Sequence, residues 1–351
     1  DRIYLKTLTR REAVKITSIQ NIPIEVPYYE HLGPPMQRVR QTPKYPTIRT
    51  HIYIVDTDVG LSGYGEGPNM GAEVEACIGH HPVEYLMDDR TKGIQIACYD
   101  LVGKLLGQPA HRLYGPQIRS EVLMCYWSHC FAPEMMAAEA QTAVEKGFKV
   151  HKIKARPWER TVEQVAAMVE GVPSDYRIVV DPNGSYGRPT EALRQIRDLE
   201  TFPAVWAMEE PISWDQIDGY KFLKSHIDYP IALHADIPSV LTAVREGLCD
   251  YFVSEFHYSA KLVQDCGVAR AGENKGFWVE NGLWTGISHA FQLHQAAAIP
   301  NIYLLITLAV LAQDDMIVEP MSVEDGHMAV PEGPGLGITL DMDALEKYRI
   351  D

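Results

Sequence analysis

The first part of the chain has the pattern of an antiparallel sheet followed by a helix. Residues 16–26 are rich in β-branched side chains, and apolar and polar positions alternate over 47–56. A turn at 58–60 leads into a second alternating stretch, which predicts a hairpin. From 93 to 106 the apolar spacing becomes helical, and a Gly-Gln-Pro sequence ends it. Residues 28–45, rich in Pro, Gly and charge, predict a long loop, and loops of that length are commonly functional lids.

After about residue 120, short β-rich runs alternate with amphipathic helical stretches. The predicted strands are 122–127, 150–155, 177–180, 204–208, 231–233, 251–253 and 277–279, and the predicted helices include 133–146, 162–170 and 190–199. Alternation of this kind predicts a parallel sheet, and seven or eight units favour a closed barrel over an open sheet. The tail, 317–349, contains a Gly-Pro-Gly-Leu-Gly sequence and two short β patterns, and we expect it to return to the first domain.

Composition narrows the class of protein. A chain of 351 residues exceeds the usual size of one hydrophobic core, so a large barrel or two domains is expected. The net charge of −15 argues against a nucleic-acid partner but does not exclude a small anionic substrate. No apolar run is long enough for a membrane span, and the N-terminus shows no signal-peptide pattern. The six cysteines form no CxxC pair, which predicts buried free thiols and a cytoplasmic protein.

Charged and polar residues follow the predicted strands at regular intervals. They are Lys152 and Lys154, Asp181, Glu209 and Glu210, Asp236, Glu255 and Asn281. From one predicted strand end to the next, counted from Lys154, the gaps are 19 to 28 residues, about the length of one β/α unit. Because barrel enzymes carry their chemistry at the carboxyl ends of their strands, we expect these side chains to meet at one mouth.

These residue types fit metal-assisted proton abstraction. Acidic oxygens that converge repel one another unless a cation lies between them, and oxygen ligands favour Mg²⁺. A lysine beside that cation loses its proton more easily and can act as a base. The same metal would hold a substrate carboxylate and stabilise the enolate formed when the α-proton leaves.

Several short motifs occur along the chain in a specific order. They are Tyr99-Asp100-Leu101-x-Gly103-Lys104 with Gly107-Gln108-Pro109, Lys152-x-Lys154, Asp181-Pro-Asn183-Gly, Glu209-Glu210-Pro211, the segment 278–301, and Pro334-Gly335-Leu336-Gly337. By these motifs the chain resembles the enolase superfamily, in its mandelate racemase/muconate lactonizing enzyme branch. The resemblance implies an α/β fold, a modified (β/α)7β TIM-type barrel with an N-terminal α+β capping domain. It places the domains at 1–120 (cap), 121–316 (barrel) and 317–351 (segment returning to the cap), with lids at 28–45 and 63–73. It also implies a homo-oligomer, a dimer or an octamer.

Residue by residue, the resemblance assigns Asp181 and Glu209 as Mg²⁺ ligands and Lys154 as the base, with Lys152 beside it. The third ligand is expected at Asp236, with His234 or water as alternatives, because the usual acidic motif is absent here. Asn183, Glu210 and His234 are expected to contact the substrate.

On the opposite face the chain departs from the family pattern. Glu255 and Asn281 stand where family members carry a second Lys or a His, which argues against racemisation. An ion-pair role for Glu255 and a helix-capping role for Asn281 are alternatives.

The leading hypothesis is a Mg²⁺-dependent lyase that dehydrates a sugar acid or a related small hydroxycarboxylate. In it Lys154 removes the α-proton, and Glu255 protonates the departing β-hydroxyl if its pKa is raised. A racemase, epimerase or cycloisomerase is the alternative, and a metal-binding barrel without catalysis is a further one.

Overall fold

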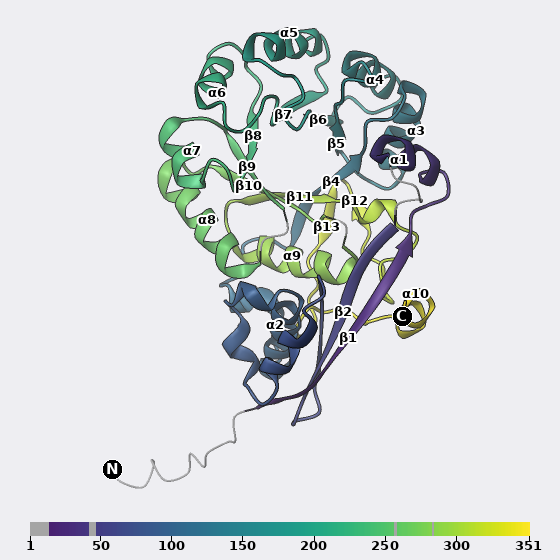
Figure 1. The fold of residues 1–351 in the computed structure, drawn as a ribbon, viewed down its shortest axis with the longest axis vertical. Coiled ribbons are helices and arrows are strands. Elements are labelled where there is room, and N and C mark those ends of the chain that lie inside the picture. Colours follow the sequence, from purple (N-terminus) through teal and green to yellow (C-terminus); the bar gives the residue numbers. More distant parts are fainter. Residues whose placement is uncertain (1–13, 42–46, 256–257, 283) are drawn as a thin grey trace.

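A closed barrel of eight parallel strands forms the centre of the molecule. The computed structural model describes residues 14–41, 47–255, 258–282 and 284–351. The strands β4 to β11 pair in sequence order, and β11 pairs with β4 to close the ring. A helix follows each strand from β4 to β10, so that α3 to α9 surround the barrel (Figure 1). This confirms the predicted (β/α)7β architecture.

The strands in chain order are β1 Ile16–Pro27, β2 Thr47–Thr57, β3 Ser62–Gly67, β4 Glu121–Ser128, β5 Val150–Lys154, β6 Arg177–Asp181, β7 Val205–Glu209, β8 Ile231–His234, β9 Tyr251–Glu255, β10 Gly276–Glu280, β11 Ile302–Thr307, β12 Val323–Glu324 and β13 His327–Ala329. The α-helices are α1 Gly33–Arg40, α2 Gly93–Leu106, α3 Pro133–Glu145, α4 Thr161–Val169, α5 Pro189–Leu199, α6 Ile217–Lys224, α7 Val240–Glu246, α8 Ser259–Glu273, α9 Gly286–Ala298 and α10 Met342–Tyr348. The predicted end of α2 is correct, because Gly107 adopts a left-handed conformation at φ 62° and caps the helix.

The N-terminal sheet consists of β1, β2 and β3, all antiparallel, with α2 packed against β3. Backbone contact sets this packing, because a Cβ on Gly65 would lie 1.9 Å from the carbonyl oxygen of Gly93. Gly63 approaches Ala97 in the same way. The expectation of a lid at 63–73 is therefore wrong for residues 63–67, which form a strand pressed onto a helix.

The expectation of a long loop over 28–45 is also wrong in part. Residues 33–40 form α1, which has a proline in its first turn, where its missing N–H is not needed. The segment lies against the barrel, since His31 Nε2 is 3.4 Å from Glu139 Oε1 on α3. Residues 42–45 of the predicted loop lie outside the described residues.

The C-terminal segment contacts both the barrel and the N-terminal sheet. The hairpin β12–β13 adds to β4 in antiparallel fashion. Farther on, the Leu336 N–H donates to Asp100 Oδ1 of α2 at 2.8 Å, and the Ile350 N–H donates to the Pro23 carbonyl of β1 at 3.0 Å. The domain limits 1–120, 121–316 and 317–351 stay a prediction.

The barrel interior is apolar toward the amino ends of the strands and polar at their carboxyl ends. Trp206, Tyr251 and Trp278 stack near the amino ends, with ring centroids 4.9 Å apart for Tyr251 and Trp278. All six cysteines are buried free thiols, as expected. In the described part of the chain, we find no helix with the length and apolar character that crossing a bilayer requires.

Candidate active site

Six consecutive barrel strands each end on an ionisable residue. These terminal residues are Lys154 on β5, Asp181 on β6, Glu209 on β7, His234 on β8, Glu255 on β9 and Glu280 on β10. In five of the six strands a run of mostly apolar residues precedes the terminal ionisable residue, whereas β5 carries His151 and Lys152 before Lys154. The carboxyl ends of barrel strands are where chemistry is usually placed.

Lys152 lies at the centre of this layer and is fully buried. Its Nζ is 2.5 Å from Glu209 Oε1, 2.9 Å from Glu280 Oε2 and 3.2 Å from Asp181 Oδ2. Burial by itself would lower the pKa of Lys152, but the nearby carboxylates, Glu209 foremost, outweigh it and raise the pKa well above its usual value. Lys152 is therefore a fixed cation, which favours an electrostatic role over proton abstraction.

Lys154 is the lysine nearer to solvent, with 13% of its side chain exposed. It donates a short hydrogen bond to Asp181 Oδ2. Burial opposes ionisation of Asp181, yet Lys154 and Lys152 hold the pKa of its carboxyl far below the usual range. The other oxygen of Asp181 accepts the Asn183 N–H at 2.9 Å. The Asn183 side chain is exposed and bonds to Arg156, so the structure turns it away from the lysines.

His234 connects two of the acidic groups. Its Nδ1 is 2.9 Å from Glu210 Oε1, and its Nε2 is 3.4 Å from Glu255 Oε1. Burial opposes the charged imidazole, but Glu210 and Glu255 overcome it and raise the pKa of His234 well above its usual value. Glu210 itself adopts a left-handed backbone conformation at φ 43°, an uncommon one for a non-glycine residue.

Glu255 is placed at the mouth as predicted, with 71% of its side chain exposed. The contact with His234 lowers its pKa, ahead of a smaller opposing effect of burial. The expected role of Glu255 as the acid that protonates the leaving hydroxyl requires a raised pKa. In this structure its pKa is lowered instead.

Glu280 is a site residue that the sequence reasoning missed. It pairs with Glu255 in the β9–β10 ladder, and the gap 280 − 255 = 25 falls within the spacing of the other members. This spacing could have pointed to it. The adjacent Asn281 is fully buried, and its side-chain amide has no hydrogen-bond partner among the described residues.

Asp236, the expected third ligand, lies outside this group. It follows β8 by two residues, its side chain is 54% exposed, and Oδ1 is 3.4 Å from Lys261 Nζ. The structure brings His234 to the other acids instead.

The donor set fits a divalent cation. Glu209, His234 and Glu280 each offer one ligand atom, and these atoms all lie within 4.8 Å of one another. Glu209 Oε2 and His234 Nε2 are buried and have no hydrogen-bond partner in the described parts of the chain. Burial, followed by repulsion from Asp181, raises the pKa of Glu209 to about 8, and a cation would relieve that unfavourable charge. The structure thus has a candidate metal site.

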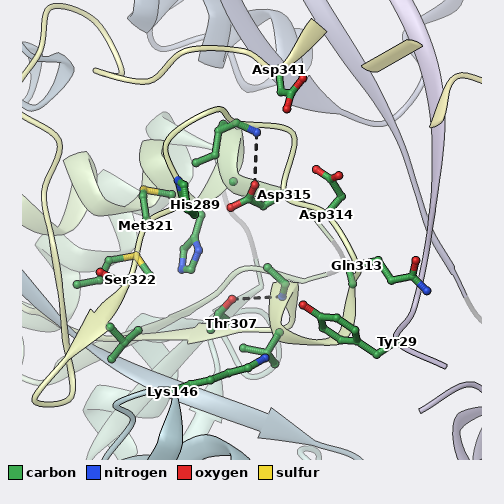
Figure 2. Close-up of a pocket in the computed structure, with 18 of the residues that line it drawn as sticks. Tyr29, Lys146, His289, Thr307, Gln313, Asp314, Asp315, Met321, Ser322 and Asp341 are labelled. Carbon is green, nitrogen blue, oxygen red and sulfur yellow. Dashed lines mark hydrogen bonds between the residues drawn. The ribbon is translucent and has the colours of Figure 1, made fainter. Parts of the chain in front are cut away.

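A separate cavity of about 610 Å³ lies between α9, the segment after β11 and Tyr29. Figure 2 shows His289 and Lys146 among its lining side chains, together with the carboxylates of Asp314, Asp315 and Asp341. Its lining includes Thr307 at the end of β11 but none of the six ionisable residues that end β5 to β10. The cavity is therefore distinct from the strand-end site.

Comparison with known proteins agrees with this architecture. Residues 135–344 match the family described as Enolase C-terminal domain-like. The chain is 28% identical to the N-succinyl-L-Arg/Lys racemase of Bacillus cereus, over 96% of this chain and 98% of that protein. It is 26% identical to the arabinonate dehydratase of Saccharolobus solfataricus, over 84% of this chain and 89% of that protein.

Solved structures share the fold. The muconate lactonizing enzyme from Pseudomonas fluorescens superposes with a TM-score of 0.80 at 21% identity, covering 96% of this chain and 100% of that one. The relatives are lyases and isomerases, as expected for an enzyme of this superfamily. From the match over 135–344 and the (β/α)7β barrel, the chain belongs to the Enolase C-terminal domain-like family, among relatives of the mandelate racemase/muconate lactonizing enzyme branch.

Proposed function

We propose that the protein is a divalent-metal-dependent dehydratase of a sugar acid or a related small hydroxycarboxylate. The observation that carries the proposal is the placement of Lys154 and Glu255. They end β5 and β9, which are 9 − 5 = 4 strands apart in a ring of eight, so they face each other across the barrel mouth. A substrate bound between them would meet a base on one side and a carboxyl group on the other.

Each side chain has a stated part in this reaction. Lys154 takes the proton α to the substrate carboxylate, while the buried ammonium of Lys152 stays charged and attracts that carboxylate. Glu255 protonates the departing β-hydroxyl, which requires substrate binding to release the contact with His234 that lowers its pKa. Asp181, Glu209 and Glu280 would hold the cation. When bound, that cation would stabilise the negative charge that develops on the substrate.

Mg²⁺ is the cation implied by the family resemblance, and carboxylate oxygens are its preferred ligands. The substrate class is supported by relatives named for arabinonate, D-gluconate and D-xylonate dehydration, at 25% to 26% identity. A homo-oligomer stays an expectation from the resemblance.

Racemisation or epimerisation is the second candidate. The same pair of opposed residues favours it, because a carboxylate facing Lys154 could exchange a proton on the second face of the carbon. The similarity to the Bacillus cereus racemase points the same way.

Turnover on a panel of sugar acids and hydroxycarboxylates, with Mg²⁺ and in deuterated water, separates the candidates. Dehydration gives a 2-keto acid, detected as its semicarbazone. Deuterium at the α-carbon with inverted configuration and no loss of water would favour the second candidate. Binding of the metal and of acids, with neither product nor exchange across the panel, would leave a barrel without catalysis and contradict both.

A further inference from the structure

Glu210 sets the orientation of the His234 ring. Glu210 Oε1 lies 2.9 Å from His234 Nδ1 and also accepts the His234 backbone N–H at 3.3 Å. The left-handed backbone of Glu210 holds this carboxylate beside the imidazole. An Nδ1–H that keeps donating to Glu210 fixes the ring, so that a cation can displace the Nε2 proton and bind there, which is the arrangement found for most metal-bound histidines.

His234 Nε2 points toward the other acids. It is 3.9 Å from Glu209 Oε1, too far for a hydrogen bond and close enough for both atoms to reach one ion. Lys152 contacts Oε1 of Glu209, whereas Oε2 is buried without a partner among the described residues. Nε2 of His234 is also buried and makes a long contact of 3.4 Å with Glu255 Oε1. A buried carboxylate oxygen without a partner, beside an imidazole nitrogen with only this long contact, calls for a further group between them.

We propose that His234 is a metal ligand through Nε2, together with Glu209 and Glu280, and that Glu210 is its positioning residue. The inference rests on the proposed function only in assuming a cation at this mouth. Imidazole nitrogen suits first-row transition metals, whereas Mg²⁺ prefers an all-oxygen shell. The site therefore prefers a transition-metal dication that accepts nitrogen ligands, such as Fe²⁺, Ni²⁺ or Zn²⁺, over Mg²⁺. Mn²⁺, which accepts an imidazole more readily than Mg²⁺ does, serves as the paramagnetic probe.

The test uses the whole chain stripped of metal and titrated with Mn²⁺, Mg²⁺ or both. We expect Mn²⁺ to bind at least about tenfold more tightly than Mg²⁺, as a mixed nitrogen and oxygen donor set predicts. The pulsed electron paramagnetic resonance spectrum of the Mn²⁺ form should show ¹⁴N coupling from a bound imidazole. This spectrum needs no variant, so it does not depend on how a substitution folds.

Three variants refine the assignment. His234→Asp replaces nitrogen by oxygen, and it should abolish the ¹⁴N coupling and bring the two metal affinities close to each other. Glu210→Gln should weaken Mn²⁺ binding by roughly 10- to 100-fold, as loss of an orienting partner does. His226→Asp changes an exposed histidine near the end of α6 and serves as the matched control, with coupling and affinities unchanged.

The outcomes separate this inference from the proposed function. Metal binding without ¹⁴N coupling, or with Mg²⁺ as tight as Mn²⁺, would overturn the role of His234 and leave a carboxylate-bound dehydratase standing. Coupling that survives in His234→Asp would also overturn it. Failure to bind any divalent cation would overturn both proposals.

Discussion

Glu66 Oε1 in β3 accepts the backbone N–H of Thr285 at 2.7 Å, a contact between residues 219 positions apart in the chain. Its second oxygen accepts the Thr285 hydroxyl at 3.0 Å and the Ser288 N–H at 3.2 Å. Glu66 therefore caps the amino end of α9 from the N-terminal sheet, where a negative charge also interacts favourably with the helix dipole. This fully buried carboxylate joins the sheet to the barrel next to the strand-end layer.

Replacing Glu66 by Ala should destabilise the protein. Two buried backbone N–H groups would lose their acceptor, and each unsatisfied donor costs about 1–3 kcal/mol, partly offset because a buried charge is removed. We expect a net loss of about 2 kcal/mol in the free energy of unfolding, measured by urea denaturation. Glu73→Ala, at an exposed position near the same strand, is the control. Equal midpoints for the two variants would show that the capping contact contributes nothing.

The contact between β3 and α2 leaves no space for a side chain on the strand. Gly65→Ala would place its Cβ 1.9 Å from the Gly93 carbonyl oxygen, so we expect a loss of about 3 kcal/mol or more, or failure to fold. Gly267→Ala is the matched control, because open space surrounds this glycine in α8. Alanine there should raise stability by about 0.5–1 kcal/mol. Thermal melting of both variants checks the pair, and a melting temperature for Gly65→Ala near that of the wild type would contradict the packing.

Acid should destabilise the fold through buried neutral histidines. His151 bonds to Tyr176 and Ser128, and burial lowers its pKa to about 3. Between that value and the unfolded pKa near 6.5, only the unfolded chain binds the proton. Stability from His151 is therefore present at neutral pH and falls as the pH drops below about 6.5, by up to ~1.4 kcal/mol per pH unit.

His151→Gln should make this decline shallower, even if the variant is less stable at pH 7. The measurement is the denaturation midpoint between pH 7 and pH 4. The exposed His80→Gln should follow the wild type. Identical slopes for all three proteins would mean that His151 titrates alike in the folded and unfolded chain.

Variants of Lys154 and of Glu255, on opposite sides of the barrel mouth, should differ in their effects on proton exchange and on dehydration. Lys154→Met should abolish exchange of the substrate α-proton with solvent, since Lys152 is buried in ion pairs and cannot replace it. Glu255→Gln should slow dehydration by ~10²–10⁴-fold and leave exchange running, as for loss of a general acid. Proton exchange followed by NMR distinguishes them. Loss of exchange in both variants would favour a two-base epimerase, and survival in Lys154→Met would exclude Lys154 as the base.

Metal affinity should distinguish the acids inside the cluster from the one outside it. Asp181→Asn, Glu209→Gln and Glu280→Gln should each weaken divalent binding by at least about tenfold, or ~1.4 kcal/mol, while the fold persists. Asp236→Asn should bind normally, because its carboxylate lies beside Lys261. Calorimetric titration with Mg²⁺ and Mn²⁺ provides the measurement. A larger loss of affinity in Asp236→Asn than in Glu280→Gln would favour Asp236 as the third ligand, as predicted from the sequence.

The local pattern of the chain was enough to predict the barrel and much of its mouth. The alternation of strands and helices depends on residues close together in the chain. Gly107 ends α2 through its own backbone conformation. Both features can therefore be predicted from the sequence. Lys154, Asp181 and Glu209 were predicted at strand ends because an ionisable residue follows an apolar run. The structure places all three in one layer.

Only the tertiary structure decided which neighbouring residue points into the site. Pairing between strands, and not the run of apolar residues, sets where each strand ends and which side chain faces the barrel axis. Register with β9 puts Glu280 beside Lys152, ahead of the predicted Asn281, and β8 ends on His234 two residues before Asp236. The hairpin over 62–67 was predicted, but its packing on α2, which excludes a lid there, was not. Glu66 contacts Thr285 only because the sheet docks on the barrel. Such contacts join residues far apart in the chain, and no local pattern encodes them.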